Sequence, residues 1–181
     1  MLVIAINIAT CAMMLAASIR SGSTALLSGT LDNFGDALTD ALSLLVVGPS
    51  VAAQAPVALL KAALIIGAAI AVGVQIALKL RNPDMPIIET MSIAAVLNLA
   101  ANGLCLLQLN PYRHGDINMA SSWECSRHDV FEGLAVLAAA GAAWLAASGW
   151  PDLIIAGALL VMFLRSAVRA FAASVKASRA T

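Results

Sequence analysis

The chain has 181 residues with ten basic and ten acidic side chains, so its formal net charge is zero. Hydrophobic residues make up 61% of it and charged residues only 11%, against about 25% charged residues in a soluble domain. This composition excludes a soluble single domain and a disordered chain, and the lack of a basic face excludes a nucleic-acid partner. Continuous runs of Ala, Leu, Val and Ile favour an all-α polytopic membrane protein.

Six apolar stretches are each long enough for the roughly 20 residues that a membrane-spanning helix needs. They are predicted at about 2–19, 25–47, 57–78, 86–109, 121–147 and 152–175. Turn-forming residues separate them, such as Gly48-Pro49 after the second stretch and Pro151 at the start of the sixth. We therefore expect six transmembrane helices in one bundle, as a single transmembrane domain over residues 1–181 with no soluble domain.

An even number of spans places both termini on the same side of the membrane. The loops and the chain end on that side carry six basic residues, and the opposite loops carry three. The six are Lys61, Arg113, Arg165, Arg169, Lys176 and Arg179, and the three are Arg20, Lys79 and Arg81. Because basic residues are enriched in cytoplasmic loops, the sequence predicts that both termini are cytoplasmic.

The second span contains three acidic residues, Asp32, Asp36 and Asp40, at positions i, i+4 and i+8. This spacing puts them on one stripe of a helix. A carboxylate at mid-membrane costs about 2.5–3.5 kcal/mol on insertion scales, so it usually faces a partner or a water-filled cavity. Asp32 and Asp36 form the deeper pair, whereas Asp40 is equally well explained as an interfacial residue.

The fifth span is the other one with many ionisable groups. Cys125 and Asp129 stand at i and i+4, and Glu124, His128 and Glu132 form an adjacent stripe at i, i+4 and i+8. Glu124 is also explained by a solvated pair with the nearby basic residue at position 127. His128 is also explained as a structural hydrogen-bonding residue.

Two helices that each present ligand-type side chains one turn apart form a four-ligand site when they face each other. Carboxylate, imidazole and thiolate groups are the ligands of Zn²⁺ and of other first-row ions. Clustered carboxylates repel one another, and either a divalent cation or protons relieve that repulsion. Asn98 and Asn102 in the fourth span could line this site, but packing or the orientation of Asp32 or Asp129 explains them better.

The segment Gly22–Leu38, with its Gly-Ser-x-Ala-Leu-Leu entry followed by Asp32-x-x-x-Asp36, resembles the second helix of the cation diffusion facilitator family. The stretch from Asn118 to Asp129 is similar to the entry of the family's fifth helix. In that alignment, Cys125 occupies a ligand position where the family carries His or Asp. The six-helix count agrees as well, and the chain is similar to a short form without the cytoplasmic domain that usually follows the sixth helix.

The resemblance implies a metal site made by Asp32, Asp36, Cys125 and Asp129, with Cys125 ranked above His128. His128, Asp40, Glu132 and Asn102 are secondary candidates. It also implies a homodimer that exports a divalent metal ion (Zn, Co, Fe, Mn, Ni or Cd) against inward proton flow. We expect an integral protein of a bacterial inner membrane.

Two alternatives remain open at this point. One is a proton-coupled exporter of a small organic cation, although aromatic residues, which would wall such a site, make up only 4% of the chain. The other is a non-transporting membrane protein whose acidic residues form a structural polar network. An enzyme is not expected, because the sequence has no hydrolase motif and no cofactor fingerprint.

Overall fold

The computed structural model describes residues 2–45, 51–113 and 117–178, where all the regular secondary structure is helical. Side chains are described at positions 5–35, 37, 38, 64–111, 113, 123, 124, 126–165 and 168. The six α-helices within the described ranges are α1 (Leu2–Ser21), α2 (Thr24–Leu45), α3 (Val51–Lys79), α4 (Ile88–Leu109), α5 (Ile117–Ala146) and α6 (Trp150–Ser178). A short 3-10 helix, η1 (Asn110–Tyr112), follows α4. The predicted all-α fold is confirmed.

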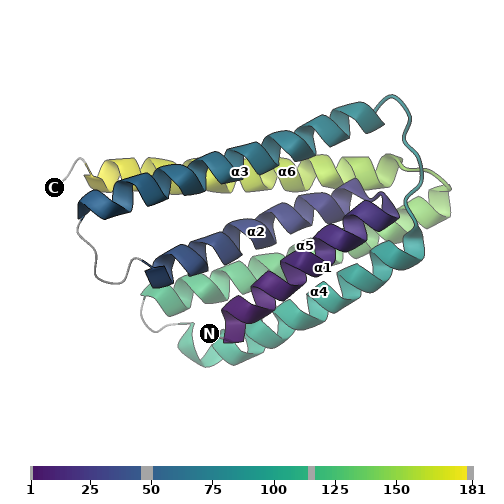
Figure 1. Ribbon diagram of the computed structural model, residues 1–181. Coiled ribbons are helices and arrows are strands. Elements are labelled where there is room, and N and C mark those ends of the chain that lie inside the picture. The colour runs from purple at the N-terminus through teal and green to yellow at the C-terminus, as the bar shows by residue number, and fades with distance from the viewer. Residues whose placement is uncertain (1, 46–50, 114–116, 179–181) are drawn as a thin grey trace.

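The helices form one elongated bundle around α2 (Figure 1). Helix α2 contacts α1, α5, α3 and α6, while α4 packs against α1 and α5. Helices α3 and α6 lie side by side on one side of α2, and α1, α4 and α5 lie on the other (Figure 1). Helix α1 begins and α6 ends at the same end of the bundle, which we call the terminal end. The opposite end, the hairpin end, holds the connections at residues 22–23, 80–87 and 147–149.

Two helical segments in the described part of the chain are long and apolar enough to cross a membrane, Ile88–Leu109 and Ser126–Ala146. Two shorter apolar segments are Ala5–Ser21 and Leu64–Lys79. Large apolar side chains point outward from several helices, including Ile19 on α1 and Leu107 on α4. Such an outer surface is costly in water and suits a lipid environment.

The main core is built largely from small side chains, which let the helices approach closely. It contains the alanines at positions 17, 25, 94, 95, 139, 140 and 156, together with Met14, Leu26, Met91, Val136 and Leu159. A second cluster, formed by Leu31, Ala69, Val72 and Phe163, joins α2 to α3 and α6. Because α2 contributes to both clusters, its position in the bundle is fixed from two sides.

A buried carboxylate holds the start of α2 at the hairpin end. Asp152 in the first turn of α6 is only 1% exposed. It accepts hydrogen bonds from Ser23 Oγ at 2.6 Å, from the Thr24 amide at 2.7 Å and from the Ala25 amide at 3.1 Å. The first amides of a helix have no intrahelical partners and carry partial positive charge, so a carboxylate stabilises them. Asp152 therefore ties α2 to α6.

Backbone hydrogen bonds link the other connections at the same end. The Ile87 amide donates to the Ser21 carbonyl at 2.8 Å, and the Gly149 amide donates to the Pro83 carbonyl at 3.2 Å. The hairpin end is thus held together by direct contacts between the connection before α4, the end of α1 and the α5–α6 turn.

Some helices extend past the predicted apolar stretches. Helix α3 begins at Val51 instead of about 57, and α5 begins at Ile117 instead of about 121. The apolar stretch measures the thickness of a membrane core, whereas a helix continues as long as its backbone hydrogen bonds do.

Candidate metal site

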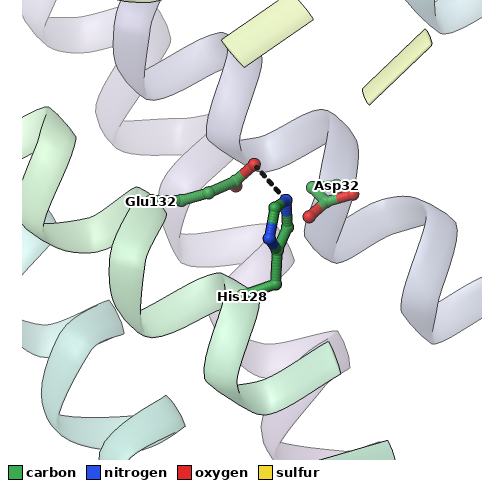
Figure 2. A group of neighbouring side chains, drawn as sticks. All are labelled: Asp32, His128 and Glu132. Carbon is green, nitrogen blue, oxygen red and sulfur yellow. Dashed lines mark ion pairs between the residues drawn. The ribbon is translucent and has the colours of Figure 1, made fainter. Parts of the chain in front are cut away.

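Three ionisable side chains from two helices converge inside the bundle (Figure 2). Asp32 projects from α2, and His128 and Glu132 project from α5 one helical turn apart. Each offers one ligand atom, and these three atoms all lie within 4.8 Å of one another. The trio combines one ionisable group of the second span with two of the fifth. They meet because α2 and α5 are in contact.

The trio contains two acidic groups and one imidazole. His128 Nε2 lies 3.8 Å from Glu132 Oε1, which makes an ion pair when the imidazole is protonated. Asp32 interacts electrostatically with His128, and a carboxylate oxygen of Asp32 lies within 4.8 Å of one of Glu132. Two carboxyl groups hydrogen bond only when one of them carries a proton. The site therefore either holds a proton between its acids or bears two negative charges that attract a cation.

The trio is more buried on the side of the hairpin end. The His128 side chain is 41% exposed, whereas the Glu132 side chain is only 5% exposed. One turn further along α5, Val136 is fully buried together with Met14 and Leu26. This apolar layer lies on the hairpin side of the trio, and His128, its more exposed member, is nearer the terminal end along α5 than Glu132 is.

Gly29 of α2 is the backbone position beside Glu132. A Cβ atom at Gly29 would lie 3.2 Å from Met14 Cε and 3.8 Å from Glu132 Oε2. A side chain there would press on Met14, whereas its distance from the Glu132 carboxylate would be an ordinary van der Waals contact.

Asp129, a predicted ligand, is not one of the three residues of the trio. It is only 2% exposed, and it interacts electrostatically with Cys105, a buried residue of α4. Because Asp129 follows His128 directly, its side chain points about 100° around α5 from the imidazole. It therefore belongs to the α4 side of α5.

The other predicted ligands are only partly described. Asp36 and Asp40 lie in α2 and Cys125 lies in α5, but their side chains are outside the described part of the structure. Their role as ligands stays a prediction. Asn102, a secondary candidate, is fully buried and bonds to Asn98 instead of standing in the trio.

The remaining acidic residue of the fifth-span stripe lies near the bundle surface. Glu124 Oε2 pairs with Arg127 Nη2 at 2.8 Å, and both side chains are about half exposed. The Arg127 guanidinium also stacks 5.2 Å from the centre of the Trp123 ring. Glu124 is thus engaged in a surface ion pair away from the trio.

A cluster of three buried amides lies next to the trio. Asn33 Nδ2 on α2 and Asn102 Nδ2 on α4 each donate a hydrogen bond of 3.2 Å to Asn98 Oδ1. The four-residue spacing of Asn98 and Asn102 predicts that these two are paired, but it gives no sign of Asn33. The signal that could have revealed Asn33 is a polar amide directly after a membrane-embedded Asp32.

The fold and the site together define a polytopic helical membrane protein with a partly buried acidic site between α2 and α5. The cation efflux transmembrane domain matches residues 1–177, so the chain belongs to the cation efflux family, the cation diffusion facilitators. The family resemblance of the second helix is therefore confirmed. A comparison with curated proteins gives no match.

Family membership establishes the general activity. Members of this family are transporters that move metal cations across membranes, and this domain is their membrane-embedded part. The protein is therefore an integral membrane protein for cation transport.

Proposed function

We propose that this protein exports a divalent transition-metal ion in exchange for protons, and that Asp32, His128 and Glu132 bind the ion during transport. The observation that carries the proposal is the approach of these three ligand atoms to within 4.8 Å of one another. Two carboxylates and an imidazole are ligands that Zn²⁺ and its first-row neighbours accept, and three protein ligands leave a position for water or a further side chain.

Metal and protons compete for the same atoms of this site. A metal ion binds deprotonated ligands, so each acidic ligand must release its proton before the ion enters. The same acids regain protons when the ion leaves, which relieves the repulsion between Asp32 and Glu132. Proton entry therefore favours metal release, which is the physical basis for exchange.

Asp36, Cys125 and Asp129 remain proposed ligands beside the trio. Asp36 follows Asp32 by one turn on α2, which keeps it on the same face. Cys125 and Asp129 are one turn apart on α5, and a rotation of α5 by about 60° would exchange the His128 stripe for the Cys125 stripe. Transport through the bundle requires some such helix movement, because carriers with mid-membrane sites work by alternating access.

We place both termini in the cytoplasm of a bacterial inner membrane, which follows from the six-to-three excess of basic residues on their side. His128, the more exposed member of the trio, then lies on the cytoplasmic side of Glu132 along α5, where the exported ion would enter. We also propose that the protein is a homodimer, on the basis of the family resemblance. The transported ion is one of Zn, Co, Fe, Mn, Ni and Cd. Reporter fusions at both ends test the orientation, since a signal from the outer side contradicts it.

Transport by purified protein in proteoliposomes tests the function directly. Zn²⁺, Co²⁺, Mn²⁺ and Cd²⁺ are added outside vesicles that carry a metal-sensitive dye and a pH dye inside. We expect metal uptake coupled to proton release from the vesicles, with loss of both signals in Asp32→Asn and His128→Ala. Uptake that continues without proton movement would contradict exchange.

Glu124→Gln is the matched control for these variants. It removes a carboxylate from the same helix, but Glu124 is half exposed and paired with Arg127. Transport by this variant should equal that of the wild type. If Asp32→Asn and His128→Ala also transport normally, the trio is not the binding site, and a structural polar network becomes the better explanation.

A further inference from the structure

The buried amide cluster of Asn33, Asn98 and Asn102 adjoins the candidate metal site at Asn33, which directly follows Asp32 in α2. All three side chains are at most 2% exposed. Their two hydrogen bonds meet at one atom, Asn98 Oδ1, which accepts from α2 and from its own helix α4. This arrangement lowers the stability of the folded bundle, because Asn33 Oδ1 and Asn102 Oδ1 are buried without a hydrogen-bond partner in the described structure.

We infer that Asn98 is a positioning residue for metal binding, which acts through Asn33 to set the rotation of α2 and thereby aims Asp32 at His128 and Glu132. This inference rests on the proposed function of the trio. Asn33 directly follows Asp32, so the two side chains leave α2 about 100° apart. One points to α4 and the other to α5, and one short backbone segment fixes both directions.

The sensitivity of the site to this rotation follows from helix geometry. Side-chain groups lie about 5–6 Å from a helix axis, so turning α2 by about 30° moves them by about 3 Å. A shift of that size breaks the 3.2 Å bond between Asn33 and Asn98 and is large against the 4.8 Å spread of the ligand atoms. The bond therefore holds α2 within the narrow range of rotation in which Asp32 can share an ion with α5.

Asn102 orients the Asn98 amide for its hydrogen bond with Asn33. It donates to the same oxygen of Asn98 as Asn33 does, which orients the Asn98 amide with its oxygen toward both donors. Apolar packing holds α2 from two sides, and Asp152 and Ser28 give it polar contacts with α6. The bond between Asn33 and Asn98 adds a directional contact with α4 directly beside Asp32.

The test measures metal affinity and metal coordination in Asn98→Leu and Asn33→Leu. Purified protein in nanodiscs is titrated with Zn²⁺ by calorimetry and with Co²⁺ by visible absorption, whose bands report the coordination geometry. We expect each variant to weaken binding by about tenfold, as other outer partners of metal ligands do. The double variant should also weaken it by about tenfold, since both substitutions remove the same bond.

Asn7→Leu is the matched control. Asn7 is a buried amide of α1 whose Oδ1 has no hydrogen-bond partner in the described structure, and α1 contributes no residue to the trio or to the amide cluster. Its replacement should change thermal stability but leave the Zn²⁺ affinity and the Co²⁺ spectrum as in the wild type. If Asn98→Leu does not fold, Asn33→Leu carries the same test from the other side of the bond.

The outcomes separate this inference from the proposed function. If the wild type binds neither Zn²⁺ nor Co²⁺, the proposed function fails. If the wild type binds both ions and the Asn33 and Asn98 variants match Asn7→Leu in affinity and spectrum, the amides are purely structural and the inference is overturned. A double variant that weakens binding by about a hundredfold would show that the two residues act independently, which also contradicts it.

Discussion

Replacing Glu132 by Gln should have opposite effects on the metal-free protein and on metal binding. The ligand atoms of Asp32 and Glu132 lie within 4.8 Å of each other. Two unit charges at that distance repel by about 3.5 kcal/mol at an effective dielectric constant of about 20. Removing one charge therefore relieves up to about 3 kcal/mol of repulsion in the metal-free state when both acids are ionised. We expect metal-free Glu132→Gln to be at least as stable as the wild type.

The same substitution removes a metal ligand. At a Zn²⁺ concentration of about 100 times the wild-type Kd, binding stabilises the folded state by about 2.7 kcal/mol. If the variant binds about 100-fold more weakly, the same concentration stabilises it by only about 0.4 kcal/mol. Thermal unfolding at about pH 8.5, where ordinary carboxyl groups are ionised and ordinary imidazoles are neutral, measures both effects with and without Zn²⁺.

The control is Glu124→Gln, which should keep the full metal-induced stabilisation. The reasoning is refuted if metal-free Glu132→Gln is clearly less stable than the wild type and still gains as much from Zn²⁺. That result would make Glu132 a structural residue of the bundle. Equal loss of metal stabilisation in Glu124→Gln would also refute it, because the effect would then not depend on the trio.

Three further predictions concern the scaffold. Asp152→Asn should lower the free energy of unfolding by about 1–3 kcal/mol, because one amide at the start of α2 loses its acceptor. The stabilisation by metal should persist. Thermal unfolding with and without Zn²⁺ measures both effects. Gly149→Ala should prevent folding or reduce the yield of folded protein strongly, because its Cβ would clash with the backbone carbonyl oxygens of Asp84 and Pro83. Size-exclusion chromatography measures the yield of folded protein. Gly141→Ala is the control and should behave as the wild type, because the space around its new Cβ is open. Arg127→Ala should change stability by no more than about 1 kcal/mol, because its pair with Glu124 is half exposed; a larger loss in thermal unfolding would contradict this.

Much of the candidate site follows from one-dimensional spacing. The four-residue spacing of Asp32 and Asp36, and that of His128 and Glu132, is enough to predict two polar faces on otherwise apolar helices. Because unpaired acids are costly in a membrane, it also predicts that these faces meet. The family resemblance came from the Gly22–Leu38 segment for the same reason, since the motif is local in the chain.

Spacing could not decide which stripe of α5 faces α2. Cys125 with Asp129 and His128 with Glu132 are adjacent on the helix, and a rotation of about 60° exchanges them. That rotation is set by contacts along the whole helix, including Val136 in the core and Asp129 near Cys105 of α4. The sequence ranked Cys125 above His128, and the structure brings His128 and Glu132 to Asp32. The Cys125 side chain is not described, so that ranking stays a prediction.

The sequence by itself determined the helical membrane fold, because long apolar runs can satisfy their backbone polar groups in lipid only as helices or closed barrels, and their continuity favours helices. It also determined which residue types the site can use. Only the tertiary structure decided that Asn33 meets Asn98 and that Asp152 holds the start of α2, because these contacts join residues 65 and 127 or more positions apart. Such pairs depend on how the helices rotate and cross, and that arrangement is a property of the packed bundle, not of any one span.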